Sequence, residues 1–522
     1  MTRWPHTAAM LLVGTIACSS HGAATSTATP PAPSAAAATP PALARPPAAH
    51  PPVRAFQLSI DSMVGQPAFR NAHWGILIVD PDRGDTLYSH NALKLFLPAS
   101  NMKIVTGAVA LTQLGPDFRF RTTFVATGPI RSGVLEGDLV VDGRGDPSMS
   151  DHMRGDAATP FREVADSLRA HGVSQIAGRI VAGDRAFPDA TLGFGWAWDD
   201  LGEDYSAGVD DLYLNEGISE LIVHGGRAPG SRARVETRPS KSYPPVDARG
   251  VSTARGESSL HTAVDSATGV VAITGTIAPG TVDTLTWVYR DQRAAYVHAL
   301  ADALREDHIT VASHTVHRSS AAGGRPVPGG ADPAPRRGET LFVYRSPPLR
   351  DILAAMEKPS QNQIAEVLLK TLGLERSGVG SADSGRAVVE RQLIAWGAAP
   401  DGFVIRDGSG LSRYDYVSPE TIVRVLAAMR RDSAFTVFYD ALPIAGVDGT
   451  IERRMRGTAA QGNVHAKTGF VANARSLSGY VTTPAGRQLV FSLLCNNWTV
   501  PVTRVEEVQD SIAIRLASLP AP

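Results

Sequence analysis

A serine and a lysine three residues apart, Ser100 and Lys103, form the sharpest chemical motif of the chain. The run from about Ser100 to Leu114 is predicted to be a helix, on which residues three apart project from one face. A serine hydroxyl becomes a good nucleophile when a base takes its proton, and a partly desolvated lysine can be that base. We therefore predict Ser100 as a nucleophile and Lys103 as its base. The alternative is a helix cap beside a solvated lysine.

Two observations favour the chemical interpretation. The chain has only six lysines, and Ser-x-x-Lys occurs in it once. The predicted helix is also apolar on most sides, which leaves Lys103 few routes to water. Its apolar residues include Ile104, Val105, Ala108, Val109 and Leu111.

Two further short motifs offer groups that complement this pair. Lys467 and Thr468 precede strand-forming residues and offer a cation and a hydroxyl to a carboxylate, while Gly469 lets a ligand lie close to the backbone. Ser360 and Asn362 stand at the start of a predicted helix and offer a hydroxyl for proton relay and an amide for a substrate carbonyl. Taken alone, each motif is more often a turn or a helix cap.

The elements that must position these groups are visible in the hydrophobic patterning. Strands are predicted at 75–79, 118–125, 135–141, 176–182, 221–223, 308–317, 474–482 and 488–496. Further helices are predicted at 294–304, 349–356, 361–372, 383–396 and 502–516. Helices and strands at both ends thus flank a strand-rich middle, which predicts an α/β (α+β) main domain interrupted by a second unit.

The order Ser-x-x-Lys, Ser-x-Asn, Lys-Thr-Gly resembles that of the serine β-lactamase and penicillin-binding-protein superfamily. Longer stretches are similar to the class C low-molecular-mass penicillin-binding proteins, which are D-Ala-D-Ala carboxypeptidases and endopeptidases of the bacterial envelope. These stretches are 97–100, 407–413, 442–450 and 462–469, with insert motifs at 137–139, 143–147 and 195–200. The resemblance covers about residues 55–516.

The resemblance implies a transpeptidase-like domain of the penicillin-binding-protein and serine β-lactamase type with a two-domain, strand-rich insert. We expect the catalytic domain at 55–119 and 340–522. Insert domain II is expected at 120–146 and 212–339, and insert domain III at 147–211.

The resemblance also implies roles for the motif residues. Ser100 attacks the carbonyl of the penultimate D-Ala of a peptidoglycan stem peptide and forms an acyl-enzyme, while Lys103 accepts its proton. Ser360 and Lys467 pass a proton to the leaving amino group, and Asn362 holds the acyl amide. β-Lactam antibiotics would inhibit the enzyme by acylating the same serine.

The resemblance extends to the substrate pocket. Thr468 would bind the terminal carboxylate, and the backbone N–H groups of Ser100 and Phe470 would form the oxyanion hole. Phe470 and Ala472 depart from the family, which usually has a small or hydroxylated residue at the first position and in some members a polar one at the second. Three residues match positions that line the pocket for the free amino end of the stem peptide: Asp200, Tyr205 and Arg413.

The N-terminus predicts export. Residues 1–18 resemble a signal peptide of lipoprotein type, with Arg3 before an apolar stretch that is too short to span a bilayer. The stretch 15–18 resembles a lipobox whose Cys18 would be acylated, although the pattern prefers Leu where Thr15 stands. Ordinary secretion is the alternative. Residues 19–54, rich in Pro and Ala, predict an extended tether. We therefore expect a periplasmic or envelope protein that touches a membrane only through this anchor. With Cys18 acylated, it would be an outer-membrane lipoprotein.

Other functions are less well supported. The net charge of −1 does not favour nucleic-acid binding, and the chain has no metal-binding motif, so we expect neither metal nor cofactor. Ser409 stands in Asp-Gly-Ser-Gly, which predicts a tight turn and not a Ser-His-Asp hydrolase. Two alternatives stay open: a β-lactamase or esterase on the same fold, and a non-catalytic protein that binds peptidoglycan. The sequence also leaves the balance of carboxypeptidase and endopeptidase action open.

Overall fold

The computed structural model describes residues 51–265, 268–314 and 338–520. The predicted signal peptide with Cys18, most of the tether and the last residues of the strand predicted at 308–317 lie outside the described residues. Helix α1 (Pro51–Val64) begins inside the segment predicted as tether. The last four residues of the predicted tether, 51–54, are thus helical. The first two are prolines, which fit the first turn of a helix because the N–H groups there have no partner within the helix.

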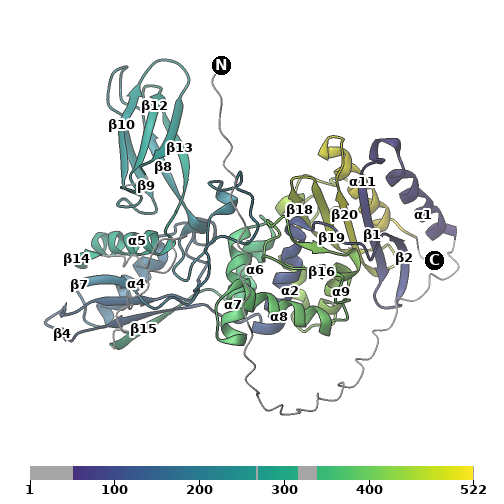
Figure 1. Cartoon of the computed structure of the whole chain (residues 1–522), viewed down its shortest axis with the longest axis horizontal. Coiled ribbons are helices and arrows are strands. Elements are labelled where there is room, and N and C mark those ends of the chain that lie inside the picture. Colours follow the sequence, from purple (N-terminus) through teal and green to yellow (C-terminus); the bar gives the residue numbers. More distant parts are fainter. Residues whose placement is uncertain (1–50, 266–267, 315–337, 521–522) are drawn as a thin grey trace, which may run out of the picture. The chain divides into compact units, whose positions relative to one another are not determined.

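A five-stranded antiparallel sheet joins the two ends of the described chain (Figure 1). Its strand order is β18-β19-β20-β1-β2, so that β18 lies at one edge. The strands are β1 (His73–Asp80), β2 (Asp85–His90), β18 (His465–Val471), β19 (Ala474–Thr482) and β20 (Gln488–Asn496). In the central pair β1 and β20, Trp74 lies opposite Cys495, which is fully buried.

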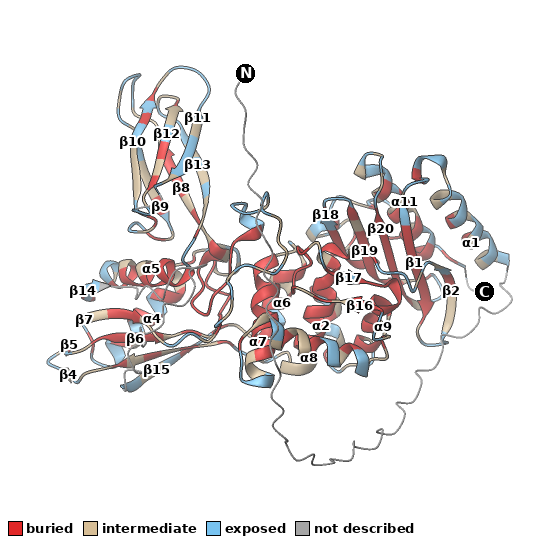
Figure 2. Ribbon diagram, viewed as in Figure 1, coloured by how far each residue is buried: buried red, intermediate tan, exposed pale blue. Residues whose placement is uncertain are grey.

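Helices cover both faces of this sheet. Alternate residues of a strand point to opposite faces, and Ile76 and Ile78 therefore pack with α1 and α11 (Val502–Ala517), whereas Leu77 and Val79 pack with the remaining helices. Those helices are α2 (Met102–Leu114), α6 (Leu349–Glu357), α7 (Asn362–Ser377), α8 (Ala382–Ala395), α9 (Pro419–Met429) and α10 (Phe435–Ala441). Figure 2 shows α2 and the central strands as buried.

The inserted segment forms a second sheet of seven strands, in the order β15-β3-β6-β7-β5-β4 with β14 paired to β7. The strands are β3 (Arg121–Ala126), β4 (Ile130–Arg131), β5 (Val134–Leu135), β6 (Leu139–Asp142), β7 (Gln175–Ala182), β14 (Thr310–His314) and β15 (Glu339–Arg345). Two helices, α4 (Thr159–Ala170) and α5 (Gln292–Glu306), share a hydrophobic core with this sheet.

Two three-stranded sheets form a separate small unit within the insert. The first has the order β10-β12-β11 and the second β13-β8-β9. Their strands are β8 (Ile218–His224), β9 (Arg234–Arg238), β10 (Val246–Thr253), β11 (Ser259–Val264), β12 (Val271–Ile277) and β13 (Val282–Val288). Leu221 and Val223 of one sheet and Val251 and Ile273 of the other share one core, so the two sheets pack as a sandwich.

The structure groups the strands of the insert differently from the predicted division. We expected 147–211 to form insert domain III, but β7 pairs with β6 and β14 in the larger sheet. The separate unit is instead the sandwich at 218–288, inside the range assigned to insert domain II. The hydrophobic pattern of β7 predicts a strand but not its partner strands. Those partners precede β7 in the sequence, as β5 and β6 do, or follow it by more than a hundred residues, as β14 does.

Candidate active site

The Ser-x-x-Lys motif occupies the start of α2. Ser100 lies in a 3₁₀ turn, η2 (Ala99–Asn101), and the Nζ atom of Lys103 lies 2.8 Å from its Oγ atom. Ser100 is partly exposed, whereas Lys103 is 0% exposed. The residue before the serine, Ala99, has a φ of 49°, a left-handed conformation that L-residues rarely adopt. Such backbone strain is concentrated at functional sites, where the surrounding structure enforces it.

Three acceptors surround the amine of Lys103. Besides the hydroxyl of Ser100, Nζ donates to Oδ1 of Asn362 at 2.6 Å and to the carbonyl oxygen of Ser409 at 3.0 Å. Burial, followed by the charge of Lys467, lowers the pKa of Lys103 to about 7. A large fraction of the molecules therefore carries a neutral Lys103 at neutral pH, as a general base requires.

Strands β18 and β19 are hydrogen-bonded to the serine turn. The side chain of Asn101 donates from Nδ2 to the carbonyl oxygen of Lys467 at 2.8 Å, and Oγ of Ser476 donates to the carbonyl oxygen of Pro98 at 2.7 Å. A β-carbon on Gly469 would lie only 2.8 Å from the backbone nitrogen of Ser100. The absence of a side chain at Gly469 thus allows strand and turn to touch.

The Lys-Thr-Gly motif and the residue after it, Phe470, belong to strand β18. Lys467 is fully buried, and burial lowers the pKa of its amine. The hydroxyl of Thr468 lies 2.6 Å from that of Thr450. Phe470 is 56% exposed, and its ring centroid lies 5.5 Å from the guanidinium of Arg475. The backbone of this strand thus adjoins the serine while the large side chain of Phe470 extends toward solvent.

The Ser-x-Asn motif connects α6 to α7. Asn362 is the first residue of α7, and its amide accepts from Lys103 and donates from Nδ2 to the carbonyl oxygen of Tyr205 at 2.7 Å. Ser360 is partly exposed and has a φ of 70°. Within the part of the chain that the structure describes, its hydroxyl makes no hydrogen bond to Ser100 or Lys103.

The three residues predicted for the amino-end pocket meet although they are far apart in the sequence. Asp200 and Tyr205 lie between β7 and β8, and Arg413 lies between β16 (Phe403–Val404) and β17 (Tyr416–Val417). The carboxylate of Asp200 accepts from the hydroxyl of Tyr205 at 3.0 Å and from Nη2 of Arg413 at 3.2 Å. The cluster thus presents a carboxylate, a hydroxyl and a guanidinium beside Asn362.

Sequence reasoning missed two contributors to the site. It predicted a tight turn at Asp-Gly-Ser-Gly, and Asp407 does hold that turn by accepting from the backbone of Gly410 and Ser412, both at 2.7 Å. It did not foresee that the carbonyl of Ser409 would reach Lys103, since a backbone acceptor leaves no mark on the sequence. The second is Glu357, which is buried next to both lysines. Glu357 directly follows the helix predicted at 349–356, so the prediction gave no sign that it would be buried.

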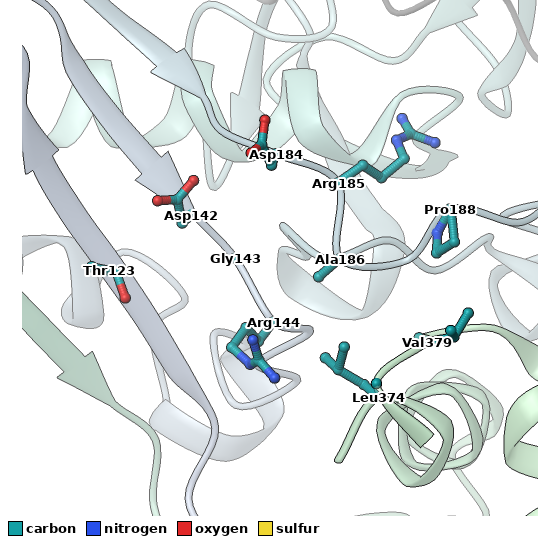
Figure 3. Close-up of a pocket in the computed structure, with 12 residues that line it drawn as sticks. Thr123, Asp142, Gly143, Arg144, Asp184, Arg185, Ala186, Pro188, Leu374 and Val379 are labelled. Atoms are coloured by element: carbon teal, nitrogen blue, oxygen red, sulfur yellow. The ribbon is translucent and has the colours of Figure 1, made fainter. Parts of the chain in front are cut away.

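A cavity of about 620 Å³ lies elsewhere, between the large insert sheet and the end of α7 (Figure 3). None of the predicted site residues lines it. Its two guanidinium groups are already paired, Arg144 with Glu375 at 2.8 Å and Arg185 with Asp210 at 3.2 Å. Among the described residues, no cluster of His, Cys, Asp or Glu side chains is arranged to hold a metal ion.

Residues 56–519 match the D-Ala-D-Ala carboxypeptidase 3 (S13) family. The chain belongs to this family. It is 34% identical over 474 residues to a D-alanyl-D-alanine carboxypeptidase of Actinomadura sp. (strain R39), covering 88% of this chain and 84% of the relative. It is 25% identical over 431 residues to D-alanyl-D-alanine carboxypeptidase DacB of Haemophilus influenzae, covering 81% of this chain and 85% of that protein.

The fold agrees with this membership. The crystal structure of penicillin-binding protein 4 from Haemophilus influenzae aligns with a TM-score of 0.72 at 22% identity, covering 88% of this chain and 99% of that one. The predicted family, the α/β fold of penicillin-binding proteins and the serine-type D-Ala-D-Ala carboxypeptidase activity are confirmed. A β-lactamase and a non-catalytic binding protein, the two alternatives, are not favoured.

Proposed function

We propose that this carboxypeptidase releases the terminal D-Ala of peptidoglycan stem peptides through an acyl-enzyme on Ser100. The observation that carries this assignment is the 2.8 Å contact between Oγ of Ser100 and Nζ of Lys103, a lysine without solvent exposure. In the first step Lys103 takes the hydroxyl proton while Oγ bonds to the carbonyl carbon of the penultimate D-Ala. The backbone N–H groups of Ser100 and Phe470 receive the oxyanion that develops.

Collapse of this intermediate breaks the peptide C–N bond and leaves the acyl group on the serine. The leaving nitrogen receives a proton by way of Ser360 and Lys467, and Thr468 binds the terminal carboxylate. The amide of Asn362, already bonded to Lys103, holds the acyl amide in line with the nucleophile. With that proton delivered, Lys103 is neutral again and takes a proton from a water molecule as the water oxygen bonds to the ester carbonyl carbon. The same proton then passes to Oγ of Ser100 as the bond between Oγ and the acyl carbon breaks and the product acid leaves.

Acylation by a β-lactam tests this assignment. A penicillin resembles the substrate, and a penicillin-binding protein of the same fold has been crystallised with a β-lactam. The intact chain is expected to gain the mass of one penicillin on the peptide that contains Ser100, and Ser100→Ala is expected to gain none. Thermal unfolding of Ser100→Ala should stay close to the wild type, because Ser100 precedes the N-cap residue Asn101 and caps no helix. A stable adduct in Ser100→Ala would refute the assignment.

We further propose that Asp200, Tyr205 and Arg413 receive the free amino end of the stem peptide. The carboxylate of Asp200 offers the negative charge that an ammonium group requires, and the two hydrogen bonds it accepts fix its direction. The same acyl-enzyme would also allow D,D-endopeptidase action, in which the leaving amine belongs to a neighbouring peptide. Digestion of a defined cross-linked muropeptide, followed by identification of the products, measures the balance of the two activities.

We also propose that the protein is exported and tethered to the envelope through an acylated Cys18. The support is the resemblance of residues 1–18 to a lipoprotein signal and the composition of the tether. None of the described helices is both long and apolar enough to cross a bilayer. Metabolic labelling with a fatty acid should mark the wild type and not Cys18→Ser, while penicillin acylation should be equal in both. Labelling that persists in Cys18→Ser, or is missing from the wild type, would rule out the anchor.

A further inference from the structure

The proposed subsite for the terminal carboxylate of the substrate contains one assigned hydroxyl, that of Thr468. A carboxylate has two oxygens, and each of them can accept hydrogen bonds. The side chains at positions 468 and 470 lie on the same face of β18, because alternate residues of a strand share a face. Position 470 is a phenylalanine, which brings no hydroxyl to that face. A second hydroxyl for the carboxylate therefore has to come from another element.

Thr450 places a second hydroxyl beside the first. The hydroxyl of Thr468 donates to Oγ1 of Thr450 at 2.6 Å. Thr468 is 4% exposed, whereas Thr450 is exposed to solvent. Among the described residues, Thr468 is the only hydrogen-bond partner of the Thr450 hydroxyl. A hydroxyl rotates to suit its acceptor, so each of the two can donate to one oxygen of the same carboxylate.

The backbone at Thr450 is fixed to the connection that carries the Ser-x-Asn motif. Thr450 lies in a 3₁₀ turn, η5 (Gly449–Ile451), and its N–H donates to the carbonyl oxygen of Lys358 at 3.1 Å. Nζ of Lys358 donates to Oδ2 of Asp448 at 2.7 Å, and Oδ1 of Asp448 accepts from the backbone of Ile444 at 2.9 Å. Lys358 thus holds the turn at two points, so Thr450 needs no ligand to fix its position.

The turn adjoins both motifs to which we assigned the leaving residue of the substrate. Ser360, two residues after Lys358, serves the leaving nitrogen, and Thr468 receives the carboxylate. The leaving D-Ala carries its nitrogen and its carboxylate on one carbon, so it has to lie between these two side chains. Thr450 is bonded through its backbone to the segment before Ser360 and through its hydroxyl to Thr468. Its hydroxyl is therefore beside the leaving residue.

We propose that Thr450 is a substrate-binding residue that binds the terminal carboxylate together with Thr468. The inference rests on the proposed role of Thr468 and adds the second donor of that subsite. The pair of hydroxyls recognises a leaving group that carries a carboxylate and gives no advantage to one that lacks it. Thr450 is thus a specificity-determining residue for a free carboxyl terminus.

Two thioesters of the same N-acyl-D-Ala separate this role from the chemistry at Ser100. One releases thioglycolate, which carries a carboxylate, and the other releases ethanethiol, which does not. The wild type is expected to prefer the thioglycolate ester. Thr450→Val keeps the shape of the side chain but removes the hydroxyl. It should lower kcat/KM for the thioglycolate ester about tenfold, because a hydrogen bond to a charged group is lost, and leave kcat/KM for the ethyl thioester unchanged.

Two further variants serve as controls. Thr450→Ser restores the hydroxyl and should recover most of the preference for the thioglycolate ester. Thr458→Val is the matched control, because Thr458 belongs to the same connection before β18 and its hydroxyl donates to the carbonyl oxygen of Met455 at 2.6 Å. This variant should cleave both esters as the wild type does.

The same measurements can overturn the inference. An equal loss of kcat/KM on both esters in Thr450→Val would make Thr450 a structural residue only, and no loss on either would show that its hydroxyl does not bind the carboxylate. A wild type that cleaves both esters equally well would instead refute the carboxylate-binding role of Thr468 in the proposed function, and the inference would fall with it.

Discussion

Burial gives Lys103 a pKa that suits the base we propose it to be. In water a lysine keeps its proton to about pH 10.4. Here the amine is enclosed by α2, α7 and the Asp407 turn, and its pKa falls to about 7 chiefly because burial disfavours the charge. The three acceptors around Nζ hold the amine beside the hydroxyl of Ser100.

Replacement of Lys103 by arginine tests this at the residue scale. The acylation rate of the wild type is expected to rise as the pH passes about 7, because only the neutral amine accepts a proton. Arginine keeps the charge but does not deprotonate in this range. Lys103→Arg should therefore acylate about 10²- to 10⁴-fold more slowly at every pH from 6 to 9. Stopped-flow acylation with a chromogenic cephalosporin gives the rates, and circular dichroism checks the fold; a rate close to that of the wild type would place the base elsewhere.

At the scale of elements, the sequence predicted those whose patterning is local. The helix at 502–516 and the strands at 474–482 and 488–496 occur within one residue of the expected bounds. Contacts between distant segments could be predicted from the sequence only where a motif indicated them. The three motifs indicated that Ser100, Asn362 and Lys467 would meet, but nothing in β7 identified its partner strands, and nothing identified the carbonyl of Ser409 as an acceptor for Lys103.

The contact between β18 and the serine turn yields an element-scale prediction. An alanine at Gly469 would place its β-carbon 2.7 Å from the carbonyl oxygen of Pro98 and 2.8 Å from the nitrogen of Ser100, and neither backbone atom can rotate away. The strand must then shift from the turn. A misplacement of about 1 Å costs on the order of 10²-fold in rate. We expect Gly469→Ala to lose about that factor in penicillin acylation.

Gly172→Ala is the control for this substitution. Gly172 has a φ of 77°, and a β-carbon there would meet nothing within 4 Å. This variant should lose about 1 kcal/mol of unfolding free energy in a urea titration, because alanine disfavours the left-handed conformation, and should acylate normally. Equal acylation by Gly469→Ala and the wild type would show that the strand and the turn do not need this close contact.

On the scale of the whole molecule, the insert contributes directly to the site. The segment between β7 and β8 accepts from two side chains at the start of α7: Asn362 donates to the carbonyl oxygen of Tyr205 and Gln363 to that of Asp204, both at 2.7 Å. The indole of Trp196 donates to Asp407 at 2.9 Å. The insert thus orients Asn362, which bonds Lys103, and carries Asp200, which we propose binds the amino end of the substrate. Both effects depend on chain segments more than 150 residues apart in the sequence.

The variant Asp200→Asn tests the charge of Asp200 separately from the orientation of Asn362 by the insert. Asp200→Asn keeps an oxygen that can accept from Tyr205 but loses the negative charge, so it should weaken the binding of an ammonium group without displacing Asn362. Loss of one such ion pair of about 1.4 kcal/mol corresponds to about a tenfold change. We therefore expect kcat/KM for a stem peptide with a free side-chain amine to fall about tenfold. Acylation by penicillin, which lacks that amine, should be unchanged.

The same peptide with its amine acetylated is the control, because wild type and variant should cleave it equally. If penicillin acylation fell together with peptide cleavage, Asp200 would act on the geometry of the site and not on the charge of the substrate.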